Sequence, residues 1–224
     1  MKKLIAFVLV LASSFALFSC GASKDAIKSV NKMYRAMVPT KIVTETTQDI
    51  GSHVLTGEYI IATGTIDGKD VSTLSYKYQQ LRSVEDGAGK TEELPWEDIS
   101  LTKEYHEDKG LRENGGKWQA DGEDFAPTID DVAMKFEEKY LSDIVVDEAK
   151  KTVTFVVSKD NTVAVFGEDM APAADVTVVI THDGAAIMSF TMTYTVAAES
   201  KNHPDIVTTI KTVYSYEPQE ITLD

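Results

Sequence analysis

Long stretches of the chain alternate apolar and polar residues with a period of two, which is typical of β-strands with one buried face. In the first half, Gly51-Ser52 separates two such stretches, and Asp67-Gly68 separates the next pair. An Asp-Gly pair between alternating segments is a strong hairpin signal. The pattern therefore predicts long strands over residues 41–50, 54–66 and 71–81.

The last 80 residues repeat this alternation more regularly. Apolar residues take every second position, and threonine or serine residues lie between them. The predicted strands are 151–158, 176–180, 188–196 and 206–214. Such alternation predicts an antiparallel sheet with one apolar and one solvated face. Several of these strands exceed the usual five or six residues, so the sheet has to twist and curl.

Two segments show helical spacing instead. Apolar residues recur at helical intervals from Ser23, a candidate N-cap, to Val38, just before Pro39. A second helix is predicted over about residues 129–141. Residues 85–126 between them are rich in glycine and acidic side chains, and we expect short strands and loops there.

These elements define an α+β fold class. We expect a long, curved, half-barrel-like antiparallel sheet with about two helices packed on its concave face. The predicted organisation is a leader over residues 1–19 and one domain over residues 20–224, which includes the acidic, loop-rich segment 85–126. A mature chain of this length can bury a core of its own.

The first helix carries a basic stripe on the side opposite its apolar residues. Its members, three or four residues apart, are Lys24, Lys28, Lys32 and Arg35. Such a stripe can lie on anionic lipid headgroups, each basic residue contributing about 1 kcal/mol near the surface. The alternative is an amphipathic helix that packs on the sheet and exposes this side to water.

The N-terminus has the layout of a secretory leader. Lys2 and Lys3 precede an uncharged run over residues 4–18, which is shorter than the roughly 20 residues of a spanning helix. The following Leu17-Phe18-Ser19-Cys20 resembles the bacterial lipobox, which implies that Cys20 is lipidated. We therefore expect the protein to be exported and anchored to the cell membrane or outer membrane. The alternative is an ordinary cleaved leader with an unused cysteine.

Composition adds two constraints. Cys20 is the only cysteine, so the mature chain forms no internal disulfide. The formal net charge is −14, and losing Lys2 and Lys3 with the leader makes it more negative by two, to −16. Such a chain is not expected to bind nucleic acid.

No pattern of catalytic or metal-binding residues stands out. The histidines at positions 53, 106, 182 and 203 lack the spacing of zinc ligands. Residues 85–138 contain 17 Asp and Glu against 6 Lys and Arg, so acidic pairs arise there by number alone. We expect no enzyme, no metal and no cofactor, and a monomer.

The apolar face of the predicted sheet is the remaining candidate site. Its members are Phe155, Val178, Met188, Phe190, Met192, Tyr194, Ile210 and Tyr214. This face is either a core that the helices cover or an incompletely covered concavity for an acyl chain. Methionines suit a surface that adapts to flexible ligands. Two helices of about fourteen residues span about 21 Å each, which favours incomplete cover of a long curved sheet but does not require it.

The order of elements resembles the LolA/LppX-like group of bacterial lipoprotein-carrier half-barrels. The likeness lies in EEKYLSDIVVDEAKKTVTFVV (137–157), ADVTVVITHDGAAIMSFTMTYT (174–195) and TTIKTVYSYEP (208–218). It implies an open curved sheet that shelters acyl chains against apolar surface.

Two functions follow from these observations. We expect a membrane-anchored lipoprotein that binds a lipid or another hydrophobic ligand as a carrier or sensor. The alternative is a cell-envelope interaction module that binds a protein or wall polymer through its acidic face, with Glu92, Glu93, Glu97 and Asp98 at the contact.

Overall fold

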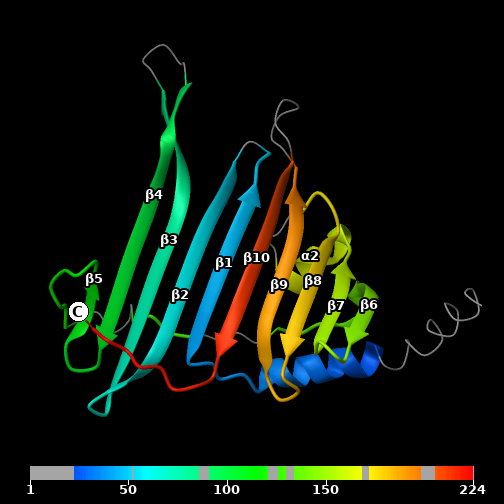
Figure 1. Cartoon of the computed structure of the whole chain (residues 1–224), viewed down its shortest axis with the longest axis horizontal. Coiled ribbons are helices and arrows are strands. Elements are labelled where there is room, and N and C mark those ends of the chain that lie inside the picture. The colour runs from blue at the N-terminus through cyan, green and yellow to red at the C-terminus, as the bar shows by residue number, and fades with distance from the viewer. Residues whose placement is uncertain are drawn as a thin grey trace, which may run out of the picture.

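The computed structural model shows one sheet of ten strands, with a helix along its lower edge (Figure 1). It describes residues 23–51, 53–85, 91–120, 126–129, 134–167, 172–197 and 205–223, and the side chains of residues 80–96 lie outside the description. The predictions on the leader and on Cys20 also fall outside the described residues.

All neighbouring strands in this sheet are antiparallel, in the order β5-β4-β3-β2-β1-β10-β9-β8-β7-β6. The first five strands are β1 (Lys41–Asp49), β2 (Val54–Ile66), β3 (Lys69–Glu85), β4 (Thr91–His106) and β5 (Gly110–Glu113). The others are β6 (Leu141–Asp147), β7 (Thr152–Val157), β8 (Val176–His182), β9 (Ile187–Val196) and β10 (Ile206–Ser215). The predicted α+β, half-barrel-like fold class is confirmed.

The first and last strands of the chain meet in the middle of the sheet. Ile42 of β1 lies opposite Tyr214 of β10 on one side and Ile61 of β2 on the other. The predicted Asp-Gly hairpin joins β2 to β3, with φ of 52° at Asp67 and 78° at Gly68. These positive values match the primed turns of tight hairpins. The strand predictions for residues 41–81 and for the last 80 residues are thus confirmed within a few residues.

The prediction of a loop-rich segment over residues 85–126 was wrong in its first part. Residues 91–106 form β4, a strand of 16 residues that pairs with β3, and β5 follows after a short turn. Ile99, Leu101 and Tyr105 alternate with polar residues, but the acidic residues around them conceal the pattern. In an edge strand such charges hinder pairing with other chains.

The prediction of a second helix over about residues 129–141 was also wrong for the described residues 134–141. Residues 134–137 have no regular structure, Glu138–Tyr140 form a single 3₁₀ turn (η2), and Leu141 begins β6. The short α2 (Thr162–Phe166) follows the 3₁₀ turn η3 (Lys159–Asn161) instead. Among the described helices, none has the length and apolar character to cross a membrane.

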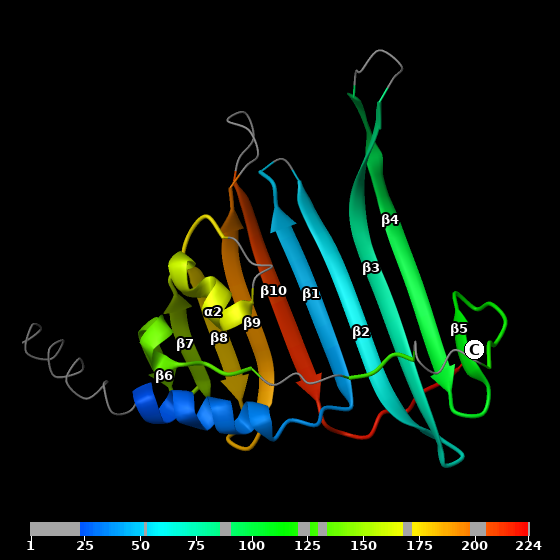
Figure 2. The ribbon, with the colours of Figure 1, turned by 180° about the vertical axis from the view of Figure 1, so that it is seen from behind.

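The N-terminal helix (residues 23–35) packs on the concave face of the sheet (Figure 2). Its apolar side is buried, with Ile27, Val30 and Tyr34 at most 3% exposed. Residues 134–137 cross the same face, and Phe136 makes edge-on ring contacts with Tyr34 (5.8 Å) and Phe155 (5.0 Å). We call the described residues 126–129 and 134–137 the strap.

One side chain joins the helix to the strap. The Asn31 amide donates to the Phe136 carbonyl at 2.7 Å, and its oxygen accepts from the Phe136 N–H at 2.7 Å. Both backbone groups of a buried residue are thereby satisfied without secondary structure. This pairing explains why residues 134–137 remain extended although their apolar spacing suits a helix.

Replacing Asn31 with alanine should destabilise the fold by about 1–3 kcal/mol, because the two backbone groups of Phe136 lose their partners. Asn161→Ala is a matched control, because the Asn161 side chain makes no capping hydrogen bond. The free energies of unfolding from urea titrations should separate the two variants. Equal losses would contradict the role given to Asn31.

Candidate functional site

The helix is too short to cover the sheet. Its 13 described residues span about 20 Å at 1.5 Å per residue. Ten strands at about 4.8 Å spacing give a sheet about 43 Å wide. Figure 2 shows the helix below β6 to β9, whereas β2 to β5 extend beyond its end. The concave face is therefore divided into a covered half and a half that the helix does not reach.

Half of the predicted ligand face lies in the covered part. Phe155 and Val178 are completely buried, and Phe190 and Tyr214 are 3% and 4% exposed. All four belong to one hydrophobic core with the helix residues. For these four residues, the alternative of a covered core is the one observed.

The other four predicted residues have mixed positions. Met192 and Tyr194 are half-buried and pack against the core, and Ile210 is half-buried. Met188 is 37% exposed and lies outside the core cluster. A register shift between Thr181 and His182 changes the alternation in β9, so that Ile187 is buried instead. The prediction that Met188 shares the apolar face was wrong.

A pocket of about 660 Å³ begins where the helix ends. Met37, Val38 and Pro39, which follow the helix, form one side of this lower pocket. Strap residues 126–129 form another side. The sheet contributes Thr63, Ser72 and Tyr105, which occupy facing positions on β2, β3 and β4.

The lining of the lower pocket is mainly apolar, with hydroxyl groups from the sheet. Ile129 of the strap also packs against the hydrophobic core, so the pocket adjoins the covered half. Ser72 is 5% exposed. Ligand sites commonly combine such a concave apolar lining with a few polar groups.

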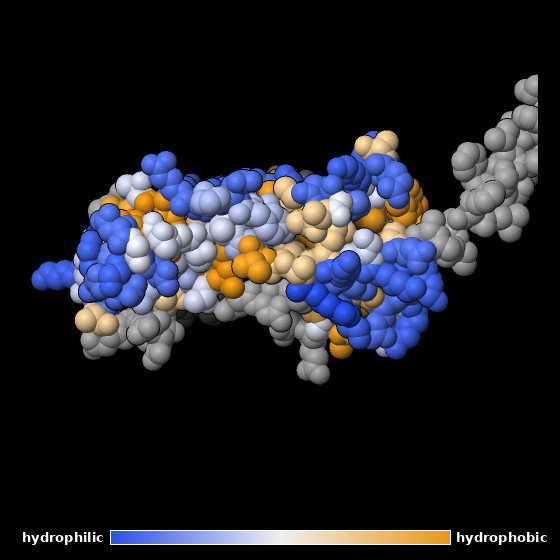
Figure 3. All heavy atoms as spheres, turned by 90° about the horizontal axis from the view of Figure 1, so that it is seen from below, coloured by the Kyte–Doolittle hydropathy of each residue, from blue (hydrophilic) through white to orange (hydrophobic). Residues whose placement is uncertain are grey.

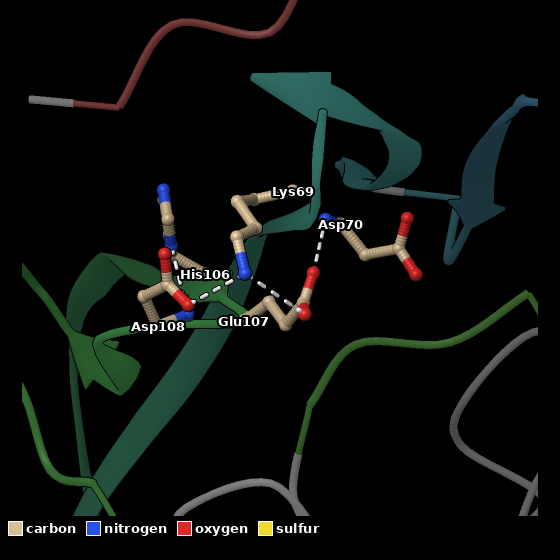
Figure 4. A network of polar contacts seen from close by, with 5 residues as sticks. All are labelled: Lys69, Asp70, His106, Glu107 and Asp108. Carbon is tan, nitrogen blue, oxygen red and sulfur yellow. Dashed lines mark hydrogen bonds and ion pairs between the residues drawn. The ribbon is translucent and has the colours of Figure 1, made fainter. Parts of the chain in front are cut away.

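A polar network holds the strand ends beside this pocket (Figure 4). Lys69 forms ion pairs with Glu107 (3.3 Å) and Asp108 (3.0 Å), which raise the pKa of its amine. The Glu107 carboxylate also accepts from the Asp70 N–H at 3.2 Å. The network joins the β2–β3 turn to the β4–β5 turn, and Asp70 lines the lower pocket.

A second hollow of about 260 Å³ lies farther up the same face. Tyr59 and Tyr76 face each other on β2 and β3 with ring centroids 6.3 Å apart, and Tyr76 stacks on Tyr78 at 4.9 Å. Thr44, Thr46 and Gln48 of β1 line its other side. This tyrosine hollow is aromatic, with threonine and glutamine residues around it and Glu58 also in its lining.

The basic stripe lies on the exposed side of the helix, where all four of its members are exposed. Lys24 is 3.8 Å from Glu138, and Lys28 is 3.6 Å from Asp25. Among the described residues, Lys32 and Arg35 form no ion pair. No His, Cys, Asp and Glu cluster suited to a metal ion occurs in the described part of the chain.

The lower pocket and the tyrosine hollow were both missed from the sequence. The alternation of β2 and β3 places Tyr59, Tyr76 and Tyr78 on the apolar face, and that signal was available. The lower pocket has no local signal, because its lining comes from segments around residues 38, 63, 72, 105 and 128. Strand pairing brings residues 63, 72 and 105 together, and the packing of residues 37–39 and 126–129 completes the lining.

No known protein-family model matches the chain, and no curated protein matches it. One similar solved structure is a DUF1329 family protein from Desulfovibrio piger ATCC 29098, with 10% identical residues. The match covers 90% of this chain and 94% of that chain, with a TM-score of 0.29. At this TM-score the likeness does not establish a shared fold, so the candidate site rests on the residues of this chain.

Two buried phenols in the covered half affect stability at high pH. Burial raises the pKa of Tyr34, and the neighbouring phenol of Tyr214 adds to this effect. Burial raises the pKa of Tyr214 from 10.0 to about 12. The folded state therefore favours the neutral phenol of Tyr214. The contribution of this group to the free energy of unfolding is fully present below pH 10 and is lost as the pH rises toward 12.

The free energy of unfolding should therefore fall as the pH rises from 10 toward 12, and Tyr214→Phe should reduce this fall. Urea titrations across this range measure both slopes. Tyr76→Phe is a suitable control, because Tyr76 is 39% exposed and outside the core. An identical pH dependence in Tyr214→Phe and in the wild type would contradict this assignment.

Proposed function

We propose that this protein is a membrane-anchored lipoprotein that binds a lipid or another hydrophobic ligand in the lower pocket, as a carrier or sensor. The observation that carries the proposal is the pocket of about 660 Å³ beyond the end of the helix. This volume lies within the range of about 300–1,000 Å³ that is typical of small-molecule sites.

The chemistry of the lining supports a hydrophobic ligand. Met37 is an adaptable side chain, and Pro39 and Ile129 add rigid apolar surface. Burial of apolar ligand surface against them contributes about 25 cal/mol per Å². The hydroxyl groups of Thr63 and Ser72 offer hydrogen bonds to an ester or hydroxyl group at one end of such a ligand.

The proposed anchor on Cys20 would hold the lower pocket near the membrane. Only two residues separate Cys20 from Ser23, the first described residue of the helix. At about 3.5 Å per extended residue, Cys20 can lie no more than about 10 Å from that helix. Two or more acyl chains on Cys20 would give stable membrane attachment. The lower pocket would then lie close to the membrane from which a lipid comes.

A bulky side chain in the lower pocket should displace the ligand. Thr65 lines the pocket and is exposed, so Thr65→Trp should fill it with little loss of stability. We expect residues 21–224 to bind cis-parinaric acid, measured by its fluorescence, and Thr65→Trp to weaken this binding at least tenfold.

Thr47→Trp is the matched control, because Thr47 is an exposed strand threonine on the opposite face of the sheet. Its affinity should stay within twofold of the wild type. Failure of the wild type to bind the fatty acid, or equal binding by both variants, would contradict the proposed pocket.

An interaction module is the second candidate, and the position of β4 favours it. β5 pairs only with Lys103–His106 of β4, and Glu97 and Asp98 are exposed farther along β4. The side chains of Glu92 and Glu93 lie outside the described residues. This part of the edge could pair with an extended basic segment of an envelope protein.

Neutralising Glu97 and Asp98 by Glu97→Gln and Asp98→Asn should then weaken binding to a poly-lysine column at least fivefold, because two favourable charge contacts are lost. Glu148→Gln with Asp160→Asn alters the charge equally at exposed positions in the β6–β7 turn and in η3, at the other end of the sheet from β4. Equal elution of the two double variants would count against an acidic interface on β4.

A further inference from the structure

The exposed side of the N-terminal helix and the residues that follow it combine two features that the hydrophobic core does not use. Its basic stripe faces away from the sheet, and Lys32 and Arg35 form no ion pair among the described residues. Just beyond the helix, Val38 is 80% exposed, more than any other large hydrophobic residue in the described part of the chain.

Local geometry explains the exposure of Val38. Pro39 follows it and is buried, and a residue before proline is restricted to extended backbone. Met37 on the other side is half-buried against the core. Because both neighbours face the protein, the Val38 side chain is held outward at the mouth of the lower pocket.

From these features we infer that the exposed side of the helix together with Val38 is a docking surface for an anionic lipid bilayer. Lys28, Lys32 and Arg35 would contact the headgroups, and Val38 would enter the interface beside the pocket mouth. This inference deepens the proposed function and rests on it for the meaning of the pocket. A hydrophobic ligand would then pass between membrane and pocket without crossing water.

The lower surface of the molecule supports this orientation. Figure 3 shows apolar side chains in the middle of that surface, with hydrophilic groups on both sides. The helix carries four basic residues and one acidic residue within residues 24–38, whereas the whole chain has a formal net charge of −14. Complementary charge therefore favours contact of this end of the molecule with anionic lipid.

The other charges at the lower ends of the strands also favour an orientation with the helix toward the bilayer. Near the helix, Glu138 faces Lys24, Asp25 faces Lys28, and Asp147 faces Lys150, so these acidic groups are partly neutralised. At the far end, Asp67 and Asp70 are exposed beside the Lys69 network. Their repulsion from anionic lipid would tilt the sheet so that the helix end lies nearest to the bilayer.

The test uses residues 21–224, which contain every described helix and strand, so that no acyl chain or leader contributes to binding. The measurement is co-sedimentation with vesicles of phosphatidylglycerol and phosphatidylcholine in equal parts. Pure phosphatidylcholine vesicles and high salt are the comparisons. We expect binding to the mixed vesicles that is strongly reduced in both comparisons, because salt screens exposed charges.

Lys32→Glu with Arg35→Glu should weaken binding to the mixed vesicles at least about 25-fold, since each basic residue contributes about fivefold. Lys117→Glu with Lys159→Glu, also at exposed positions, makes the same change in net charge away from the helix and should have less than a threefold effect. Val38→Asp should weaken binding about tenfold, whereas Val54→Asp at another exposed valine should not.

Thermal unfolding and cis-parinaric acid binding in the absence of vesicles complete the design. A Lys32→Glu, Arg35→Glu variant that keeps its stability and fatty-acid affinity but loses vesicle binding supports the docking surface. Val38 also lines the lower pocket, so Val38→Asp is judged by its stability and vesicle binding alone. Equal effects of the two charge-reversal pairs, equal binding to neutral vesicles, or no vesicle binding by the wild type would overturn it. If the wild type does not bind the fatty acid, the proposed pocket is refuted. The docking surface is tested by the vesicle measurement alone, so the two failures are distinguishable.

Discussion

The structure depends on a mismatch of length between one helix and one sheet. The helix of 13 described residues can bury the apolar face of only about four or five strands at 4.8 Å spacing. The helix, Phe136 and the strands β7 to β10 form a continuous core, which also includes Ile42 of β1 and Ile61 of β2. Beyond it, the concave face needs another cover, which the strap and residues 37–39 supply only in part. The lower pocket is a direct consequence.

The strap depends in turn on a polar interaction inside an apolar region. Asn31 satisfies both backbone groups of Phe136, so an irregular segment can cross the core without unpaired donors or acceptors. The ring of Phe136 then lies between Tyr34 and Phe155. Residues 126–129 line the lower pocket, and Ile129 packs against the same core as Phe136. Core and candidate site are thus in contact through Ile129.

Charge and apolar surface are distributed unequally along the lower edge. The basic residues lie on the helix, close to the proposed anchor, and the ion-pair network of Lys69 lies near the opposite end. The lower pocket lies between them, with Val38 at its mouth. An acidic protein with one basic element has a preferred orientation at an anionic surface. This asymmetry connects the proposed anchor, pocket and docking surface.

The alternation of apolar and polar residues was sufficient to predict the antiparallel sheet and most of its strands. It failed for β4, because charges suited to an edge strand conceal the period, and for residues 134–137, because Asn31 lies 105 residues away from Phe136. A local pattern cannot register a partner at that distance. Seven of the eight residues predicted for the apolar face are buried or half-buried, and Met188 is the exception because of a shift in register.

By itself the sequence determined the strand periodicity, the acidic charge and the basic stripe of the helix, because each depends on residues close together in the chain. It also predicts the leader and the lipidated cysteine. The tertiary structure alone decided which part of the apolar face is covered. Thr63, Ser72, Tyr105 and Ile129 line one pocket only because strand register and the strap bring them together. How much of the apolar face is covered depends on how far the helix and the strap extend across the sheet, and no local sequence pattern specifies that distance.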